Sequence, residues 1–396
     1  MTPRVAWTAR YNHPSMRLRR LAVSGLVVFA LTACSNGTAD SPQSGSVAPA
    51  PAPAPPVNVY ADAGLGALSP AAAKARSLVY VPNTKSNSVS VIDPATHTVI
   101  RTFRTGRLPQ HVVPSWDMTT LWVTNDEGDS LTRVDPVTGM DGARVPVDDP
   151  YNMYFTPDGT QAVVMAEALH RFDFRDASTM KLVASVPVQC GGLDHMDYTM
   201  DRRFGIATCE FSGQLVKIDV AARKVVGYLT LSKPAMPQDI RLAADGRVMF
   251  VADMMADGVR VIDPESFTEV GFVKMGKGTH GIVVSRDGQT FYVSNRGWNT
   301  TAGGRRGPGS ISVLDTRTRT VRATWPIPGG GSPDMGGLSA DGKELWLSGR
   351  YDDEVYAIDT TTGALIARIK VGAQPHGLCV WPQPGRVSFG HTGNMR

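Results

Sequence analysis

A repeat of seven similar units constrains the fold more than any other feature of this sequence. One strand-like run recurs as LVYVPN, LWVTN, AVVMA, GIATC, MFVAD, FYVSN and LWLSG, and the last residues of successive copies are 42, 41, 43, 44, 42 and 54 positions apart. Each copy is followed by a second run that ends in aspartate, such as SVSVID or VRVID, and then by two further strand-like runs. Four short strands between turn residues are typical of one propeller blade. The sequence therefore predicts an all-β chain whose residues 76–396 form a seven-bladed β-propeller with four-stranded blades.

The strands of each blade are named a to d here, from the channel outward. The first blade has no a strand before Ser77, whereas the segment 375–385, PHGLCVWPQPG, has the character of one. We therefore expect the C-terminal strand to complete the first blade. Such closure protects the edges that an open sheet leaves unpaired.

The runs YVPN, YVSN and VTN, together with the VID runs that follow them, resemble the YVTN family of seven-bladed propeller repeats over about residues 76–396. The resemblance implies a fold more than a function. Related propellers include lactone hydrolases, streptogramin lyases, amine-dehydrogenase heavy chains and the haem-binding domain of nitrite reductases, and many others are similar to plain binding or scaffold modules. A shared fold does not choose among these.

The d–a and b–c connections of a propeller fall on one face, so the starts of the a strands should line the mouth of the channel. Counting back from the a–b turn gives two aligned rows that hold four of the eight histidines. The candidate ligand-binding residues in these rows are His111, Asp194, His195, Asp239, His280, Asp334 and His376.

A polar mouth above an apolar wall is the usual binding site of such a fold. Imidazole and carboxylate together also suit a divalent metal, although the sequence has no HxH or HxxH pair. The same residues equally suit a structural role, in which they satisfy backbone groups and channel water at the inner edge of each blade. These three interpretations remain open at this point.

One unit is longer than the others. The step from Asn295 to Gly349 has an excess of about 12 residues, which falls in the glycine-rich segment 296–310. Arg305 and Arg306 in this segment are two further ligand-binding candidates, for an anion or an aromatic group, provided that the segment closes over the mouth. The alternative is a mobile surface insertion.

The N-terminus has the pattern of a targeting segment. Residues 16–34, MRLRRLAVSGLVVFALTAC, combine a basic start with an apolar run and small residues, and the run is too short for a comfortable membrane span. LTAC at 31–34 resembles the bacterial lipoprotein box, which implies lipidation of Cys34; the alternative is an ordinary secretory signal. We expect residues 1–33 to be a lipoprotein signal peptide that starts at Met1 or Met16, and residues 34–75 to be a Pro/Ala/Ser-rich linker. The protein is then exported and membrane-anchored, either periplasmic or on the cell surface.

The other three cysteines lie in the predicted propeller. Cys190 precedes one a strand and Cys209 ends the following b strand, so both should lie near the same face. Because export permits disulfides, we predict a Cys190–Cys209 bond. Cys379 should be a buried free thiol in the closing strand. No CxxCH or CxxC motif points to covalent haem or to a thiol oxidoreductase.

Charge argues against nucleic-acid binding. Five arginines lie in residues 1–33, and the rest of the chain carries 35 basic and 36 acidic residues. A nearly neutral domain has no general electrostatic attraction for phosphate backbones.

The predicted function is therefore a monomeric ligand- or protein-binding module, or scaffold, that acts through the polar channel mouth, with a small ligand or a periplasmic protein as its partner. One alternative is an enzyme of the lactonase or lyase type, in which a metal or a histidine acts at the same mouth. The other is an accessory subunit of a periplasmic redox enzyme. No cofactor is indicated beyond the candidate divalent metal, and no triad, phosphate loop or carboxylate pair identifies a catalytic residue.

Overall fold

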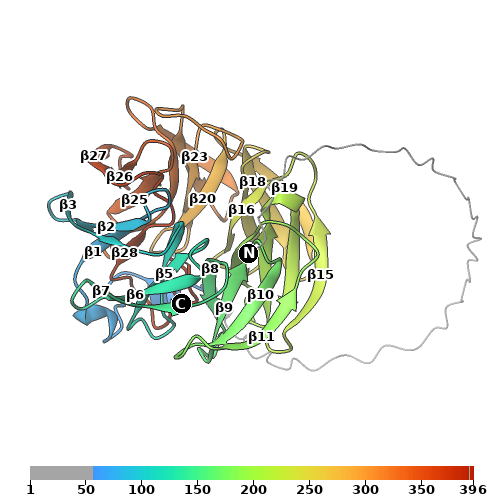
Figure 1. Ribbon diagram of the computed structural model, residues 1–396. Helices are drawn as coiled ribbons and strands as arrows, with labels where there is room; N and C mark the ends of the chain where they lie inside the picture. The colour runs from blue at the N-terminus through green and yellow to red at the C-terminus, as the bar shows by residue number, and fades with distance from the viewer. Residues whose placement is uncertain (1–56, 392) are drawn as a thin grey trace, which may run out of the picture. The chain divides into compact units, whose positions relative to one another are not determined.

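The computed structural model describes residues 57–391 and 393–396. Within this part of the chain, seven four-stranded antiparallel sheets are arranged in a ring (Figure 1). The inner strands of neighbouring blades contact one another and enclose the central channel. The predicted fold class, an all-β seven-bladed propeller, is confirmed.

The strands of each blade are given from the channel outward. Blade 1 comprises β28 (Cys379–Trp381), β1 (Leu78–Asn83), β2 (Ser88–Asp93) and β3 (Thr98–Arg104). Blade 2 comprises β4 (Pro109–Pro114), β5 (Leu121–Asn125), β6 (Ser130–Asp135) and β7 (Met140–Pro146). Blade 3 comprises β8 (Pro150–Phe155), β9 (Gln161–Ala166), β10 (Arg171–Asp176) and β11 (Leu182–Pro187). Blade 4 comprises β12 (Leu193–Tyr198), β13 (Phe204–Cys209), β14 (Gln214–Asp219) and β15 (Lys224–Thr230).

Blades 5 to 7 have the same order. Blade 5 comprises β16 (Pro237–Leu242), β17 (Met249–Asp253), β18 (Gly258–Asp263) and β19 (Thr268–Lys274). Blade 6 comprises β20 (Thr279–Val284), β21 (Thr290–Asn295), β22 (Ser310–Asp315) and β23 (Thr320–Pro326). Blade 7 comprises β24 (Pro333–Leu338), β25 (Glu344–Gly349), β26 (Glu354–Asp359) and β27 (Leu365–Lys370). Three short 3-10 helices, η1 (Ala61–Ala63), η2 (Ala72–Lys74) and η3 (Glu210–Ser212), complete the described elements.

The ring closes as predicted. The C-terminal strand β28 pairs antiparallel with β1, which lies about 300 residues earlier in the chain, through Leu78 opposite Trp381 and Tyr80 opposite Cys379. The paired strand is shorter than the predicted segment 375–385, because only an isolated bridge between Asn83 and Pro375 extends the contact. Blade 1 is therefore assembled from both ends of the described chain.

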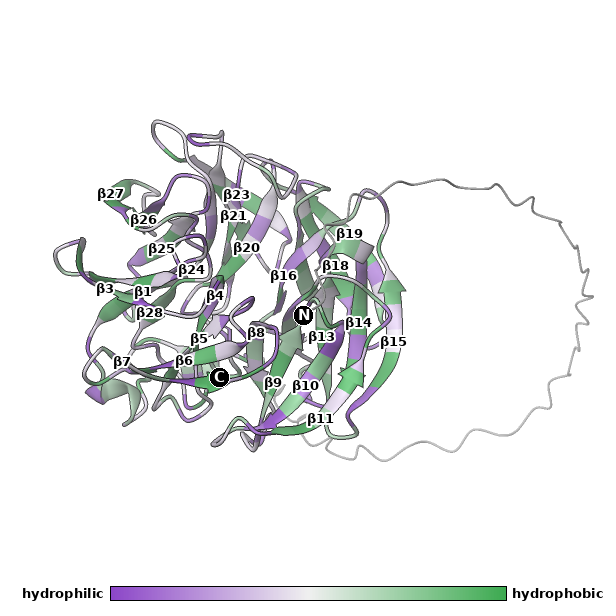
Figure 2. Cartoon of the chain, viewed as in Figure 1, coloured by the Kyte–Doolittle hydropathy of each residue, from purple (hydrophilic) through white to green (hydrophobic). Residues whose placement is uncertain are grey.

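Burial falls from the channel outward. The a and b strands are buried almost throughout, whereas outer strands such as β19 alternate between exposed and half-buried residues. Figure 2 shows hydrophobic residues concentrated in the strands. The core lies mainly between adjacent blades; for example, Tyr154 and Phe172 of blade 3 pack with Met196 and Val216 of blade 4. Each blade thus buries its faces against its two neighbours.

The most frequent polar residues of the repeat hold turns. Asp135, which ends a c strand, accepts the backbone N–H of Val137 at 2.8 Å. Asn125, which ends a b strand, donates to the hydroxyl groups of Ser130 (3.2 Å) and Thr132 (3.0 Å) across the following turn. These positions stabilise the blade, which leaves the channel residues as the candidates for function.

The segment that precedes the first blade packs on the propeller. Tyr60 is buried and donates its hydroxyl to the carbonyl of Leu242 at 2.7 Å, and Ala72 is fully buried in the core of blades 1 and 2. Residues 57–75, the last part of the predicted linker 34–75, are therefore docked on the propeller. Tyr60 and the small apolar side chains of the segment supply enough surface to dock.

Other N-terminal predictions lie outside the described residues. These are the signal peptide at 1–33, the lipidation of Cys34 and the first part of the linker, up to residue 56. Among the described residues, no helix has the length and hydropathy needed to cross a membrane.

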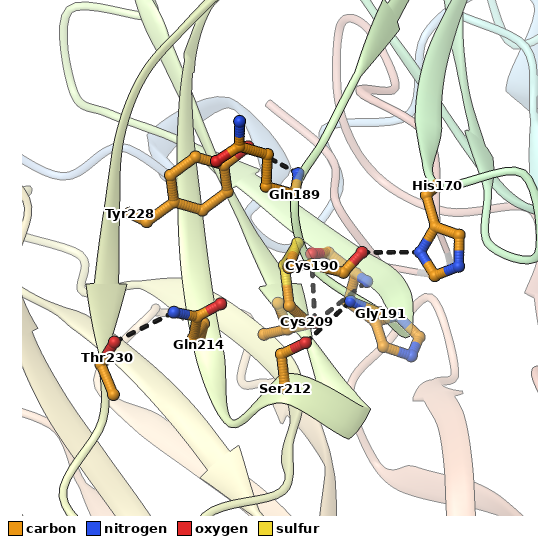
Figure 3. Close-up of a disulfide and its surroundings, with 11 residues drawn as sticks. His170, Gln189, Cys190, Gly191, Cys209, Ser212, Gln214, Tyr228 and Thr230 are labelled. Carbon is orange, nitrogen blue, oxygen red and sulfur yellow. Dashed lines mark hydrogen bonds between the residues drawn. A yellow bond between two sulfur atoms is a disulfide. The ribbon is translucent and has the colours of Figure 1, made fainter.

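The structure joins Cys190 and Cys209 by a disulfide whose Cα atoms are 5.9 Å apart (Figure 3). Both half-cystines are buried, and the loop before β12 is also held by the Gly191 N–H, which donates to Ser212 Oγ at 2.8 Å. Cys379 is a buried free thiol, and burial raises its pKa.

Candidate functional site

A β-bulge in the inner strand positions the candidate residues of five of the seven blades. In β4, Gln110 and His111 lie opposite the single residue Thr124 of β5. The same arrangement of two residues against one occurs in β12, β16, β20 and β24. A bulge releases residues from the ladder and redirects their side chains. The released pairs are Asp194 and His195, Gln238 and Asp239, His280 and Gly281, and Asp334 and Met335.

Hydroxyl groups of the b strands replace the lost ladder bonds. The N–H of His111 donates to Thr124 Oγ1 at 3.0 Å, and the N–H of His195 donates to Thr208 Oγ1 at 3.1 Å. The residue opposite the bulge is threonine or serine in four of the five cases, as in VTN, ATC and VSN, and is Ala252 in β17.

Asp334 is the centre of a satisfied ionic group. Its carboxylate accepts hydrogen bonds from Nε and Nη2 of Arg296, both at 3.0 Å, and from Nδ1 of His376 at 2.8 Å. His280 Nδ1 lies 2.7 Å from Asp334 Oδ1. Although burial raises the pKa of Asp334, the Arg296 guanidinium holds it well below its usual range. The structure thus brings three candidates together in a network whose charges compensate one another.

Three other histidines meet in the channel, and none of them is hydrogen-bonded to Asp334. His111, His195 and His391 are at most 1% exposed, and one ring nitrogen of each lies within 4.8 Å of one from each of the others. Neither nitrogen of His111, nor Nε2 of His195, has a hydrogen-bond partner among the described residues. Burial lowers the pKa of all three imidazoles, so they are neutral at neutral pH.

His391 belongs to the C-terminal tail and not to a blade. Residues 386–391 and 393–396 fold back on one another, with the N–H of Arg386 donating to the carbonyl of Arg396 at 2.8 Å. The tail enters the channel from the face of the a–b turns, where the N–H of Ser388 donates to the carbonyl of Trp116 at 3.0 Å. His391 is therefore carried to the channel histidines from the side opposite the predicted mouth.

Two anchors fix this tail. The Arg396 guanidinium lies 2.9 and 3.1 Å from the carboxylate oxygens of buried Asp197, and Gly390 pairs with Tyr154 of β8. Sequence reasoning missed His391 because it has no equivalent in the repeat. The available signal was the turn-rich segment FGHTGN at 389–394, which follows the last blade strand.

A carboxylate cluster lies on the opposite face, at the predicted mouth. The residue that follows each b strand is acidic in blades 2 to 4, as Asp126, Glu167 and Glu210, and it is arginine in blades 6 and 7, as Arg296 and Arg350. Carboxylate oxygens of Glu167, Glu210 and the bulge residue Asp194 lie within 4.8 Å of one another. The mouth is therefore acidic on one side and basic on the other. We refer to Asp126, Glu167, Asp194 and Glu210 as the acidic cluster.

The structure places Arg305 and Arg306 on the surface, where they bridge to blade 7. Arg305 pairs with Asp353, and Arg306 Nη2 lies 2.7 Å from Glu354 Oε1. Both side chains are about half exposed or more, and neither joins the channel residues. Arg296 is the arginine of this segment that reaches the channel.

A family model described as a YNCE-like beta-propeller matches residues 50–384. This chain belongs to the YNCE-like beta-propeller family. The YVTN-type resemblance agrees with this membership. No curated protein sequence matches the chain.

Solved structures share the fold of this YNCE-like propeller at low sequence identity. Hydrazine synthase of Kuenenia stuttgartiensis is 19% identical with a TM-score of 0.58, and the match covers 67% of this chain and 87% of that one. The dihydro-heme d1 dehydrogenase NirN is 15% identical with a TM-score of 0.57, covering 76% and 74%. A candidate 6-phosphogluconolactonase of Bacteroides uniformis is 16% identical with a TM-score of 0.60, covering 76% and 98%. At these identities the similarity shows the fold and leaves the function open.

The acidic cluster of this YNCE-like propeller is electrostatically strained. Burial, followed by the nearby Asp149, raises the pKa of Asp126 to about 7. Burial together with neighbouring carboxylates raises the pKa of Glu167 and of Asp194 well above the usual range. Between about pH 4 and pH 7, the folded protein therefore keeps protons on these carboxylates that the unfolded chain has released.

This difference predicts a pH-dependent effect of Asp126→Asn. The folded state binds the Asp126 proton more tightly than the unfolded state does. The contribution of Asp126 to the free energy of unfolding of the wild-type protein therefore falls as pH rises from about 4 to about 7. Between pH 5 and pH 8 the variant should gain about 2–3 kcal/mol relative to wild type, as the slope is about 1.4 kcal/mol per pH unit for one group. Urea unfolding at each pH measures the difference. The buried histidines contribute equally in both proteins, so their effect cancels in the difference. Parallel plots of the free energy of unfolding against pH for the two proteins would contradict the prediction.

Proposed function

We propose that this YNCE-like propeller is a binding module whose channel mouth takes a small positively charged ligand at the acidic cluster. One observation carries the proposal: no member of the cluster has an ion pair with a basic side chain among the described residues. Buried carboxylates without a counter-ion keep their protons because ionisation there is costly, and a bound cation stabilises the ionised form and displaces those protons.

The structure suggests which end of a ligand lies where. The carboxylates of blades 2 to 4 would hold its positive group, whereas Arg350 of blade 7 lies on the basic side and has an unpartnered, buried Nη1. Arg296 is already neutralised by Asp334. A ligand with an amine, or a hard divalent cation such as Ca²⁺, fits carboxylate donors of this kind.

Residual exposure at the acidic cluster favours binding there over the alternative of a lactonase or lyase: Asp126 and Glu210 are each 8% exposed and Glu167 is half-buried. Catalysis by a channel histidine or by a metal held there requires that substrate reach the ring nitrogens. His111 and His195 are fully buried, and His280 and His376 are at most 2% exposed and committed to Asp334. Export and lipid anchoring at Cys34 remain part of the proposal and rest on the LTAC segment.

A ligand panel tests the proposed function. Calcium chloride and 1,4-diaminobutane are titrated separately into the full-length protein while thermal unfolding is followed. At about 100 times the dissociation constant, a true ligand should stabilise the fold by about 2.7 kcal/mol. The stabilisation should disappear in Asp194→Asn/Glu210→Gln and persist in Glu127→Gln, which removes an exposed carboxylate next to the cluster. If neither cation stabilises the wild-type protein, the proposal fails.

A further inference from the structure

We infer that His111, His195 and His391 form a transition-metal site that is closed by the C-terminal tail. This inference is independent of the proposed function, because the three histidines lie outside the acidic cluster and approach the channel from different elements. His111 belongs to β4 and His195 to β12, whereas His391 is delivered by the tail. The ring centroids are 4.8–5.3 Å apart in the three pairs.

The hydrogen bonds of Asn152 indicate which nitrogens carry lone pairs. Its Nδ2 lies 3.0 Å from His195 Nδ1 and 3.2 Å from His391 Nδ1. Asn152 Oδ1 accepts the N–H of Met153 at 2.9 Å, which fixes the amide with its NH₂ group toward the two rings. An NH₂ group is only a donor, so both Nδ1 atoms must be acceptors. The Nδ1 lone pairs of His195 and His391 therefore converge on one position, which Asn152 Nδ2 occupies.

His111 supplies the third nitrogen that could ligate a metal. Both ring nitrogens of His111 lack a partner among the described residues, although the ring is fully buried. Leaving buried polar atoms unsatisfied is costly. The site makes room for this ring through Gly377, since a Cβ there would collide with His111 Nδ1. Gly377 therefore lets the unpartnered imidazole of His111 lie deep in the channel, beside the other two rings.

A carboxylate stands behind the tail histidine. Asp239 Oδ1 lies 3.7 Å from His391 Nε2, on the ring edge away from Asn152, and is itself held by Arg241 Nη1 at 3.0 Å. A carboxylate that faces the second nitrogen of a ligating histidine orients the ring and raises its basicity. Asp239 thus acts as a positioning residue for His391.

The donor set identifies the class of ion. Three neutral nitrogen donors without thiolate favour Zn²⁺ or Cu²⁺ over Ca²⁺ or Mg²⁺. Nitrogens about 2.1 Å from one ion lie about 3.4 Å apart, so the present set, whose nitrogens lie within 4.8 Å of one another, has to contract by up to about 1.4 Å. Asn152 must give up its two bonds as the ion enters. Because the rings are buried, the ion must enter while the tail is undocked, and binding should then hold the tail in place.

The full-length protein, purified without a histidine tag, tests the inference. After loading with Zn²⁺ or Cu²⁺ and dialysis, elemental analysis should find one ion per chain. The Cu²⁺ electron paramagnetic resonance spectrum should show coupling to imidazole nitrogen. His391→Ala should weaken binding about 100-fold or more, whereas His170→Ala, which removes an exposed histidine on blade 3, should leave binding unchanged.

A second measurement keeps the test decisive if His391→Ala unfolds. Hydrogen exchange of residues 386–396 in the wild-type protein should slow when the metal is added. Three outcomes would overturn the inference: less than about one tenth of an ion per chain, metal binding that leaves tail exchange unchanged, or a folded His391→Ala protein with wild-type affinity. In the first case, channel water would serve the unpartnered nitrogens. Loss of cation binding at the acidic cluster would leave the metal result untouched.

Discussion

Replacing Asp334 with alanine is expected to lower the free energy of unfolding by about 3–5 kcal/mol. The carboxylate accepts a bidentate pair of hydrogen bonds from Nε and Nη2 of Arg296, both at 3.0 Å, and a further hydrogen bond from Nδ1 of His376 at 2.8 Å. No side chain in this group is more than 6% exposed. The variant leaves the guanidinium of Arg296 buried without a counter-ion, and that charge is the source of the loss. Urea unfolding followed by tryptophan fluorescence measures it.

Two further variants separate the charge from the packing. Asp334→Asn keeps the shape and part of the hydrogen bonding, so it should lose less than Asp334→Ala. The double variant Arg296→Met/Asp334→Leu removes both charges and should be more stable than Asp334→Ala, because it leaves no unpaired charge buried in the channel. A loss below about 1 kcal/mol in Asp334→Ala would show that the network does not support the channel.

Removing the disulfide is expected to cost about 3 kcal/mol. Cys190 and Cys209 are 19 positions apart, and their bond ties the loop before β12 to the end of β13. Cross-linking a segment of this length restricts the unfolded chain and so favours the folded state. Urea unfolding of Cys190→Ala/Cys209→Ala should show a correspondingly lower midpoint.

The same experiment has an internal control. Reductant should lower the stability of the wild-type protein to that of the double variant and should leave the variant unchanged. Equal stability of oxidised and reduced wild-type protein would contradict the expected contribution. An intact bond also accords with the proposed export, since disulfides persist in oxidising compartments.

The blades were predictable because their determinants are local. The short strand-like runs and turn residues of each unit set four strands, and the missing a strand before Ser77 together with the run at 375–385 indicated the closure. Equal offsets from the a–b turn placed His111 and His195 at equivalent heights in their blades. The bulges that release them follow from a recurring hydroxyl residue, such as Thr124 and Thr208, which the sequence also displays.

The pairing of channel side chains was not predictable in this way. His280 and His376 fall one alignment row before His111 and His195, and all four were candidates for one polar mouth. The structure places the first two within 2.8 Å of Asp334, whereas both nitrogens of His111 and Nε2 of His195 lack a hydrogen-bond partner. Which side chain meets which across a ring depends on the angle between blades. That angle is set by packing among residues far apart in the chain.

The sequence by itself therefore determined the number of blades, the order of their strands, the closing strand and the strand positions that face the channel, because the strand-like runs and the turn residues act within one unit. Only the tertiary structure decided that Arg305 and Arg306 lie outside the channel, that Arg296 enters it, and that His391 joins two blade histidines. His391 has no counterpart in the repeat, so its position follows from the docking of the tail onto β8 and β12 and from no local pattern.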